Sequence, residues 1–184
     1  EEEKHIQKTN ANKELLIINN KNKSFKLFLL IIIIGTLFLV LPHFNSNLWF
    51  DEAYSISISS KTIKEIWQIS SQDVHPILYY VMLHFILLLF GENIIVAKLF
   101  SVLPVIIMGF LGYTHIRRDF GERVGYLFTF FSFFSPLIVS YAGEIRMYTW
   151  GMLFVTISFI YAFRILKKDS LMKNWILLII FSVL

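Results

Sequence analysis

Apolar residues gather in long runs along this chain, and short polar stretches separate the runs. A helix needs roughly 20 apolar residues, and at least about 17, to cross a bilayer. Runs of this kind cover about residues 25–44, 94–116, 124–143 and 147–163, and a further, shorter run begins at Trp175. The pattern predicts an all-α fold, a polytopic transmembrane helical bundle. Because the last run is too short to span, we expect the N-terminal part of a longer protein.

The apolar segment 77–90 is ambiguous, because runs of about 10–14 residues are more often re-entrant or interfacial than spanning. Lys and Arg in short loops mark the cytoplasmic side of a membrane protein. The three basic clusters, in residues 1–26, 117–123 and 164–173, share one side only if segment 77–90 does not cross. We therefore expect a cytoplasmic N-terminus and one large extracytoplasmic loop, 45–93, that shares its face with the turn 143–147.

Two juxtamembrane helices are expected inside this loop. In residues 60–71, Thr62 stands three residues before Glu65, which is the spacing of a capping box. One face of this helix would carry Ile63, Ile66, Trp67 and Ser70. A second helix is expected to begin at Pro76, since proline is favoured at the first helical position, with Asp73 and His75 just before it.

Composition supports the membrane prediction and narrows the chemistry. The chain is 56% hydrophobic, above the roughly 45–50% of soluble domains. It has no cysteine, which excludes disulfides and thiolate metal sites. Residues 1–26 read as a basic cytoplasmic tail and residues 27–184 as a membrane module. No phosphate-cradling glycine loop or basic nucleic-acid face is present, so we expect no nucleic-acid partner.

Adjacent acids, Asp51 and Glu52, follow the first span and have aromatic neighbours. A carboxylate at the boundary between water and lipid can act as a general base. The ordinary alternative is a pair of solvated loop acids beside an aromatic belt, which is common at membrane interfaces.

Two further residues could bind an anion on the same face. His75 lies near an expected helix N-terminus, where the helix dipole favours negative charge. Arg146 is the only cation in the turn 143–147, and ionisable groups near membrane depth are candidates for function. The alternatives are an exposed loop histidine and an arginine that pairs with Glu144 or with lipid phosphate. Lys98, at the outer end of its span, is expected to extend toward the headgroups, and His84 to hydrogen-bond within its own helix.

Together these residues suit sugar transfer from a polyprenyl-phosphate carrier. The acceptor hydroxyl needs a base, which Asp51 can supply. The departing phosphate needs positive charge or oriented donors, which Arg146 and His75 can supply. The helix within 77–90 can form one wall of a groove for the lipid.

The chain also resembles the N-terminal part of the GT-C membrane glycosyltransferases that use lipid-phosphate sugars, in particular the group of the protein O-mannosyltransferases and lipid A aminoarabinose transferases. The resemblance covers about residues 25–165. It rests on the ordered set Phe50-Asp51-Glu52, His75-Pro76-Ile77-Leu78-Tyr79-Tyr80, Phe90-Gly91-Glu92-Asn93, Lys98-Leu99-Phe100-Ser101, Phe120-Gly121 and Glu144-Ile145-Arg146-Met147-Tyr148.

The resemblance implies that Asp51 is the catalytic base and that Glu52 supports it. It implies that Arg146, Glu144 and Tyr148 lie beside the donor phosphate. The expected activity is that of a multi-pass integral membrane hexosyl- or pentosyltransferase, in the plasma membrane if the cell is prokaryotic, with a lipid, glycan or protein acceptor. Some branches of the superfamily hold a divalent metal. Asp51 and Glu144 could bind one, but Arg146 would oppose it, so no cofactor or obligatory metal is expected.

Two other functions remain open from the sequence. The same residues could form the headgroup site of a transporter or flippase of lipid-linked sugars, although transporters tend to bind near the membrane midplane. A truncated, inactive product is the second alternative, and we expect residues 1–184 alone to be inactive.

Overall fold

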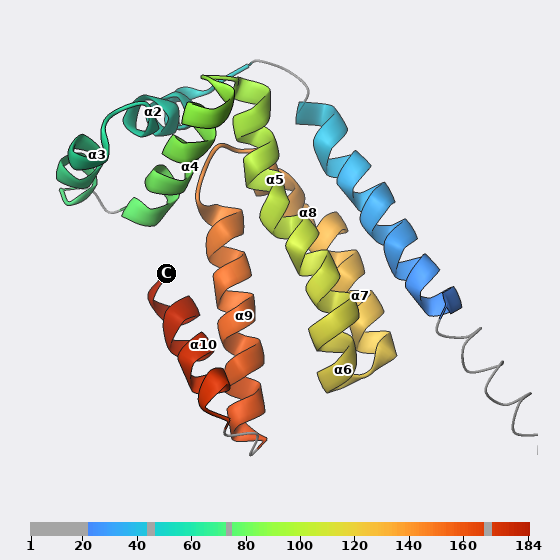
Figure 1. Ribbon diagram of the computed structural model, residues 1–184. Helices are drawn as coiled ribbons and strands as arrows, with labels where there is room; N and C mark the ends of the chain where they lie inside the picture. The colour runs from blue at the N-terminus through green and yellow to red at the C-terminus, as the bar shows by residue number, and fades with distance from the viewer. Residues whose placement is uncertain (1–21, 44–46, 73–74, 168–170) are drawn as a thin grey trace, which may run out of the picture.

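The computed structural model describes residues 22–43, 47–72, 75–167 and 171–184 of the chain, and these residues form helices joined by short turns (Figure 1). The N-terminal helix Asn22–His43 ends in the 3-10 turn η1, Leu41–His43. The later elements are α2 Phe50–Ser59, α3 Ile63–Ser70, α4 Ile77–Phe90, α5 Ile94–Leu111, the π-helical η2 Gly112–Ile116, α6 Arg117–Phe120, α7 Glu122–Phe134, α8 Pro136–Ala142, α9 Tyr148–Leu166 and α10 Met172–Val183.

Three of the described helices are long and apolar enough to cross a membrane: Asn22–His43, Ile94–Phe120 and Tyr148–Leu166. The pair α7 and α8 adds a fourth if it counts as one span. These helices confirm the predicted all-α membrane fold. In Figure 1 they lie alongside one another, while α2, α3 and α4 gather at one end of the bundle.

The span predicted at 124–143 is broken rather than straight. Its two halves, α7 and α8, meet at an angle of 51°. Ser135 is extended, with φ −65° and ψ 129°, and Pro136 begins α8. Proline disfavours a helical conformation in the residue before it and has no N–H to continue the ladder, so the helix must end at this point and start again.

The helix α3 begins as the sequence predicts, but its faces differ from the prediction. Glu65 Oε2 accepts a hydrogen bond of 3.0 Å from the Thr62 backbone N–H, and the Thr62 hydroxyl accepts the Glu65 N–H. The Thr62 hydroxyl also donates to Glu65 Oε2 at 2.6 Å, and this bond, together with that from the backbone N–H, lowers the pKa of the Glu65 carboxyl. Ile66 is buried, whereas Ile63 and Trp67 are exposed on a neighbouring stripe, so the single apolar face splits into a packed row and an outer row.

The short helix α4 connects α3 to α5. It starts at Ile77, with Pro76 as its N-cap, one residue later than predicted. His75, before α4, contacts Arg146, and Lys98, early in α5, donates to the Asn47 carbonyl oxygen at 2.8 Å. With 14 residues, α4 is shorter than the described helices that are long enough to cross a membrane, and that it does not cross stays a prediction.

Two minor predictions in this region were wrong. Lys98 is only 5% exposed and is held by Asn47, so it does not extend toward the headgroups. His84 Nδ1 lies 2.8 Å from the Ser59 carbonyl oxygen, which joins α4 to the end of α2 instead of bonding within α4. Each of these side chains contacts the backbone carbonyl oxygen of a segment that is distant in the sequence. A single sequence does not show such long-range partners.

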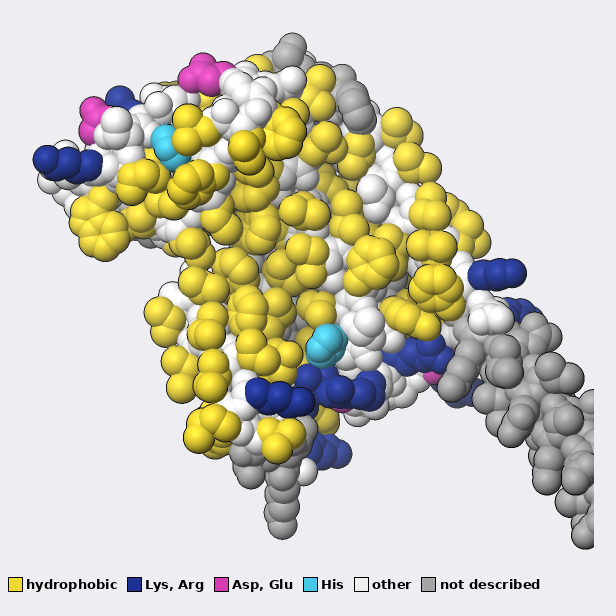
Figure 2. All heavy atoms as spheres, in the orientation of Figure 1, with side chains coloured by type: hydrophobic (Ala, Val, Ile, Leu, Met, Phe, Trp, Pro, Cys, Tyr) yellow, Lys and Arg dark blue, Asp and Glu magenta, His cyan; other side chains and the backbone are white. Residues whose placement is uncertain are grey.

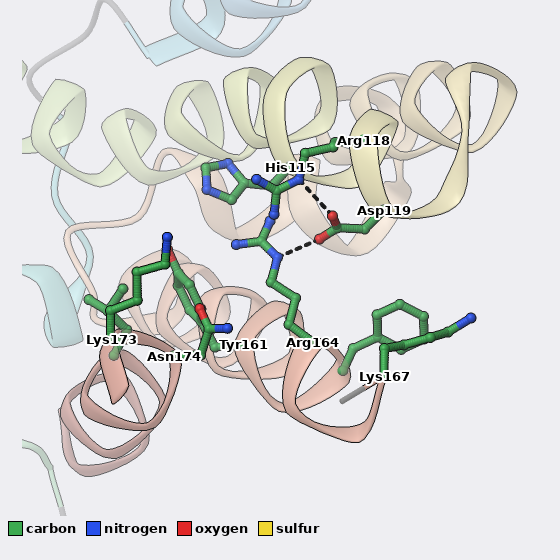
Figure 3. Close-up of a pocket in the computed structure, with 10 residues that line it drawn as sticks. His115, Arg118, Asp119, Tyr161, Arg164, Lys167, Lys173 and Asn174 are labelled. Atoms are coloured by element: carbon green, nitrogen blue, oxygen red, sulfur yellow. Dashed lines mark hydrogen bonds and ion pairs between the residues drawn. The ribbon is translucent and has the colours of Figure 1, made fainter. Parts of the chain in front are cut away.

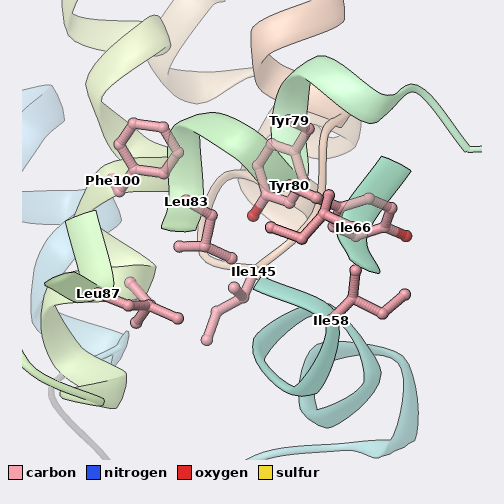
Figure 4. Packing of buried hydrophobic residues seen from close by; sticks show 9 residues of the cluster. Ile58, Ile66, Tyr79, Tyr80, Leu83, Leu87, Phe100 and Ile145 are labelled. Carbon is pink, nitrogen blue, oxygen red and sulfur yellow. The ribbon is translucent and has the colours of Figure 1, made fainter. Parts of the chain in front are cut away.

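One apolar cluster fixes the loop helices to the bundle (Figure 4). It combines Ile58 of α2, Ile66 of α3, Leu83 of α4, Phe100 of α5 and Ile145 of the turn before α9. All five are buried or nearly so. The cluster therefore ties the residues after the first span to the turn between α8 and α9.

A second cluster holds the N-terminal helix against α5 and α7. Phe133 is fully buried, and its ring lies against both Gly35 and Gly109, which have no side chain to keep it away. Small residues allow close helix packing in membranes, where dispersion rather than water exclusion drives association. At the polar end of this contact, Ser24 hydrogen-bonds to Glu122 and to Tyr126.

Replacing Gly35 by alanine should destabilise the fold by about 1–3 kcal/mol, the usual cost of overpacking. The added methyl group would overlap the Phe133 ring, which Gly109 confines on its other side. Thermal unfolding in detergent micelles measures the loss. Gly151→Ala is the matched control, because a Cβ there meets nothing within 4 Å. Equal melting temperatures for the two variants would contradict this packing.

Candidate active site

Three segments that are far apart in the sequence meet at one end of the bundle. They are the first turn of α2, His75 just ahead of α4, and the turn 143–147 between α8 and α9. The turn directly follows α8. The His43 ring packs on Gly143 so closely that a Cβ at this position would not fit. This contact brings the end of the N-terminal helix beside the turn.

Glu52 connects α2 to this turn through its buried carboxylate. It is 5% exposed. Its Oε2 accepts the Trp49 backbone N–H at 3.2 Å, which closes the start of α2, and its Oε1 accepts the Ile145 N–H at 3.1 Å. A carboxylate is a strong acceptor for buried N–H groups. Because both oxygens are engaged with the backbone, the geometry gives Glu52 a positioning role, and the prediction that it is catalytic remains untested.

Arg146 is buried, 4% exposed, and directs its guanidinium toward Asp51 and His75. Its Nη1 donates to the Asp51 carbonyl oxygen at 3.5 Å, and its Nη2 lies 3.9 Å from Asp51 Oδ2. The Asp51 side chain is 43% exposed. The long ion pair leaves this carboxylate open to solvent and to an incoming group. Among the described residues, Arg146 Nε has no hydrogen-bond partner.

His75 lies in hydrogen-bond contact with this arginine. Arg146 Nη2 is 2.7 Å from His75 Nε2. A guanidinium can only donate hydrogen bonds, so Nε2 is the acceptor in this contact. The histidine therefore orients Arg146 in this structure.

Glu144 lies at the edge of the same cluster. Burial raises the pKa of its carboxyl, and the neighbouring Glu52 carboxylate raises it further, while Arg146 lowers it in part. Its Oε2 is buried and has no partner among the described residues. A buried carboxyl with a raised pKa beside a cation is a candidate functional group.

Tyr148 connects the cluster to an apolar cavity. The Arg146 guanidinium lies 5.8 Å from the centre of the Tyr148 ring, and that ring packs against Tyr141 at 4.7 Å between centroids. Both tyrosines line a cavity of about 300 Å³ between α8 and α9, together with Leu137, Thr149 and Met152. An apolar space next to a buried cation suits a ligand with a charged head and a hydrocarbon tail.

The small pocket between α4 and α9 is a weaker match to the predicted lipid groove. It encloses about 50 Å³ and is lined by residues of both helices, among them Leu78, Tyr79 and Trp150. The helix α4 thus lines one side of this small pocket, but the larger of the two apolar cavities lies beside α8. That α4 lines a groove for the lipid stays a prediction. The sequence does not predict the contact between Tyr141 and Tyr148, because the two residues lie on different helices on either side of a turn.

The predicted site residues therefore divide into two groups. Asp51, His75, Arg146, Tyr148 and Glu144 come together around one guanidinium, and Glu52 fixes the backbone behind them. Asp73 lies outside the described residues. No group of three or more potential metal ligands occurs in the described part of the chain, and the absence of a metal requirement remains a prediction.

A larger cavity lies elsewhere. It occupies about 450 Å³ at the opposite end of the bundle, between η2 and α6 on one side and α9 and α10 on the other, and four Lys or Arg side chains line it. The cluster around Arg146 is the better candidate for the reaction, because its polar groups converge on one point and adjoin an apolar space.

Replacing Glu144 by glutamine should stabilise the protein at neutral pH. The folded state binds the Glu144 proton more tightly than the unfolded chain, so stability is lost as the pH rises from the ordinary pKa of 4.5 through the raised one. The variant should melt higher than the parent at about pH 7 and equally near pH 4. Glu92→Gln, an exposed acid in the turn between α4 and α5, should leave both values unchanged. A lower melting temperature for Glu144→Gln at pH 7 would contradict the burial of this carboxylate.

Comparison with known proteins gives one match. The profile of the family described as dolichyl-phosphate-mannose-protein mannosyltransferase matches residues 74–183, which is well over half of the chain. The matched region includes α4, the turn with Arg146 and α9. No curated protein and no solved structure matches the chain significantly. The chain thus belongs to the dolichyl-phosphate-mannose-protein mannosyltransferase family, whose members are membrane glycosyltransferases of the GT-C type.

Proposed function

We propose that the protein transfers a sugar from a polyprenyl-phosphate donor to a lipid, glycan or protein acceptor on the extracytoplasmic face. The observation that carries the proposal is the buried Arg146, which lies between the exposed Asp51 carboxylate and the apolar cavity beside Tyr148. This arrangement offers a cation for a phosphate, a base for a hydroxyl and space for a hydrocarbon chain.

In the proposed reaction the acceptor oxygen attacks the anomeric carbon of the donor sugar. Its proton passes to the Asp51 carboxylate as the new glycosidic bond forms. The bond between the anomeric carbon and the phosphate oxygen breaks, and the phosphate leaves with the electron pair. Arg146 stabilises the charge that develops on that oxygen, in a site where a fixed donor acts more strongly than it would in water.

His75 and Glu52 support this reaction as positioning residues. His75 Nε2 accepts from Arg146 and fixes the plane of the guanidinium. Glu52 fixes the backbone of the residue before Arg146. Small displacements of such groups lower reaction rates strongly, because the transition state needs both charge and alignment.

The distribution of basic residues supports the extracytoplasmic assignment. The span formed by α7 and α8 separates Arg117, Arg118 and Arg123 from Arg146, and these arginines share their side with the Lys-rich residues 1–26 if α4 does not cross. The short length of α4 and the contacts on both sides of it support that topology.

Asp51→Asn in the full-length protein should lower sugar transfer by about 10²–10⁴-fold, the usual contribution of a general base. The variant keeps the size of the side chain, so insertion and melting temperature should be unchanged. Transfer from a radiolabelled polyprenyl-phosphate sugar in proteoliposomes measures the effect. Glu92→Gln is the control for loss of an exposed acid and should retain activity. Near-normal turnover by Asp51→Asn would refute the assignment, and lipid-sugar translocation without transfer would indicate a transporter.

Arg146→Lys should reduce kcat/KM for the donor by about tenfold to a hundredfold, although the charge is kept. A lysine cannot contact Asp51 and His75 together with the planar fork that the guanidinium provides. Steady-state kinetics with varied donor concentration measure the loss. Arg123→Lys, an exposed arginine on α7, is the control. Equal kinetics for the two variants would remove Arg146 from the site.

A further inference from the structure

A basic cavity lies at the end of the bundle opposite to the candidate active site (Figure 3). It has a volume of about 450 Å³. The π-helical η2 and α6 form one side, and the last turns of α9 and the first turns of α10 form the other. A π-helical stretch interrupts the regular ladder and is frequent at functional sites.

The lining of the cavity is strongly positive. Four cationic side chains, Arg118, Arg164, Lys167 and Lys173, line it with His115, and Asp119 is the only carboxylate among its lining residues. Both oxygens of Asp119 are already engaged, by Arg118 Nε at 2.9 Å and by Arg164 Nε at 2.6 Å. The internal pairing therefore leaves a surplus of positive charge.

Arg164 supplies the second observation. It is 7% exposed, and its Nη2 is buried with no hydrogen-bond partner among the described residues. The Arg164 guanidinium also lies 5.1 Å from the centre of the Tyr161 ring, while Lys167 extends away over Phe163 (Figure 3). Burying this charge is costly, and an anion in the adjoining cavity would offset part of that cost.

The rest of the lining shows what kind of anion fits. Tyr161, Phe163 and Leu177 add apolar and aromatic surface to the cationic wall. Dark-blue side chains gather over this lower end of the molecule in Figure 2, in contrast to the yellow apolar surface above them. Basic pockets between membrane helices at the cytoplasmic level are suited to the phosphate of a lipid headgroup.

We propose that this cavity is a second anion site, which binds the phosphate group of a ligand through Arg164, Lys173 and Arg118. The Arg164 guanidinium attracts the phosphate from the base of the cavity, and the exposed ends of Lys173 and Arg118 contact it. The same chemistry serves an anionic lipid headgroup or a soluble phosphate, and the two differ in whether a hydrocarbon tail must also be bound. The site is separate from Arg146 and does not depend on the sugar-transfer proposal.

The test measures thermal unfolding of the purified protein in neutral detergent micelles. One series adds phosphatidylglycerol, with phosphatidylcholine as the uncharged reference. The other adds inorganic phosphate at an ionic strength held constant with sodium chloride. Arg118→Gln with Lys173→Gln removes two exposed cations from the cavity. Lys61→Gln with Lys64→Gln removes the same charge from the exposed surface around the start of α3 and is the matched control.

We expect phosphatidylglycerol to raise the melting temperature of the parent and of the Lys61/Lys64 variant alike. The Arg118/Lys173 variant should need about 25-fold more of it for the same rise, since each of the two surface cations adds roughly a fivefold factor. A response to the lipid alone identifies a headgroup site, and an equal dependence with inorganic phosphate identifies a site for the free ion. No response of the parent to either probe, or the same response in both double variants, would overturn the proposal.

Arg164→Lys separates the ligand contact from general charge. The lysine keeps a cation beside Asp119 but removes the planar guanidinium at the base of the cavity. If its melting temperature without added probe matches that of the parent, the variant should still show a weakened response to phosphatidylglycerol. An unchanged response in a normally folded Arg164→Lys variant would also overturn the proposal.

Discussion

The burial of one guanidinium governs the arrangement of the end of the bundle that carries the candidate site. A charged group taken out of water costs several kcal/mol unless partners satisfy it. Arg146 obtains those partners from two other segments: Asp51 at the start of α2, and His75 just ahead of α4. The outer helices therefore cannot shift independently of the turn that carries Arg146 without leaving its charge uncompensated.

The apolar packing and the polar contacts reinforce one another at this place. The Ile145 side chain is part of the cluster that holds α2, α3, α4 and α5 together, while its backbone N–H binds the Glu52 carboxylate. The next residue is Arg146. These two adjacent residues thus link the hydrophobic core of the loop to the charged cluster. The side chains of the site are therefore held by packed structure rather than by a flexible loop.

The sequence predicted the elements better than their contacts. The lengths of the apolar runs gave the spans, and Thr62 with Glu65 marked the start of α3, because both signals are local. The ordered motifs also predicted that Asp51, His75 and Arg146 belong together. The partners of Lys98, His84 and Glu52 could not be predicted, since each binds a backbone group or a segment many positions away. The bend at Ser135 was missed because a hydropathy run does not register a single proline.

The shortness of α4 has a consequence for the biogenesis of the protein in the proposed topology. A helix this apolar competes for a membrane crossing of its own while the chain is being inserted. If α4 crossed, every later helix would be inverted, and Arg117, Arg118 and Arg123 would have to pass through the bilayer. The energetic cost of translocating those residues favours the orientation in which α4 does not cross. In the proposed topology, the arginines around the turn between α6 and α7 thus determine the placement of a helix that precedes them in the chain.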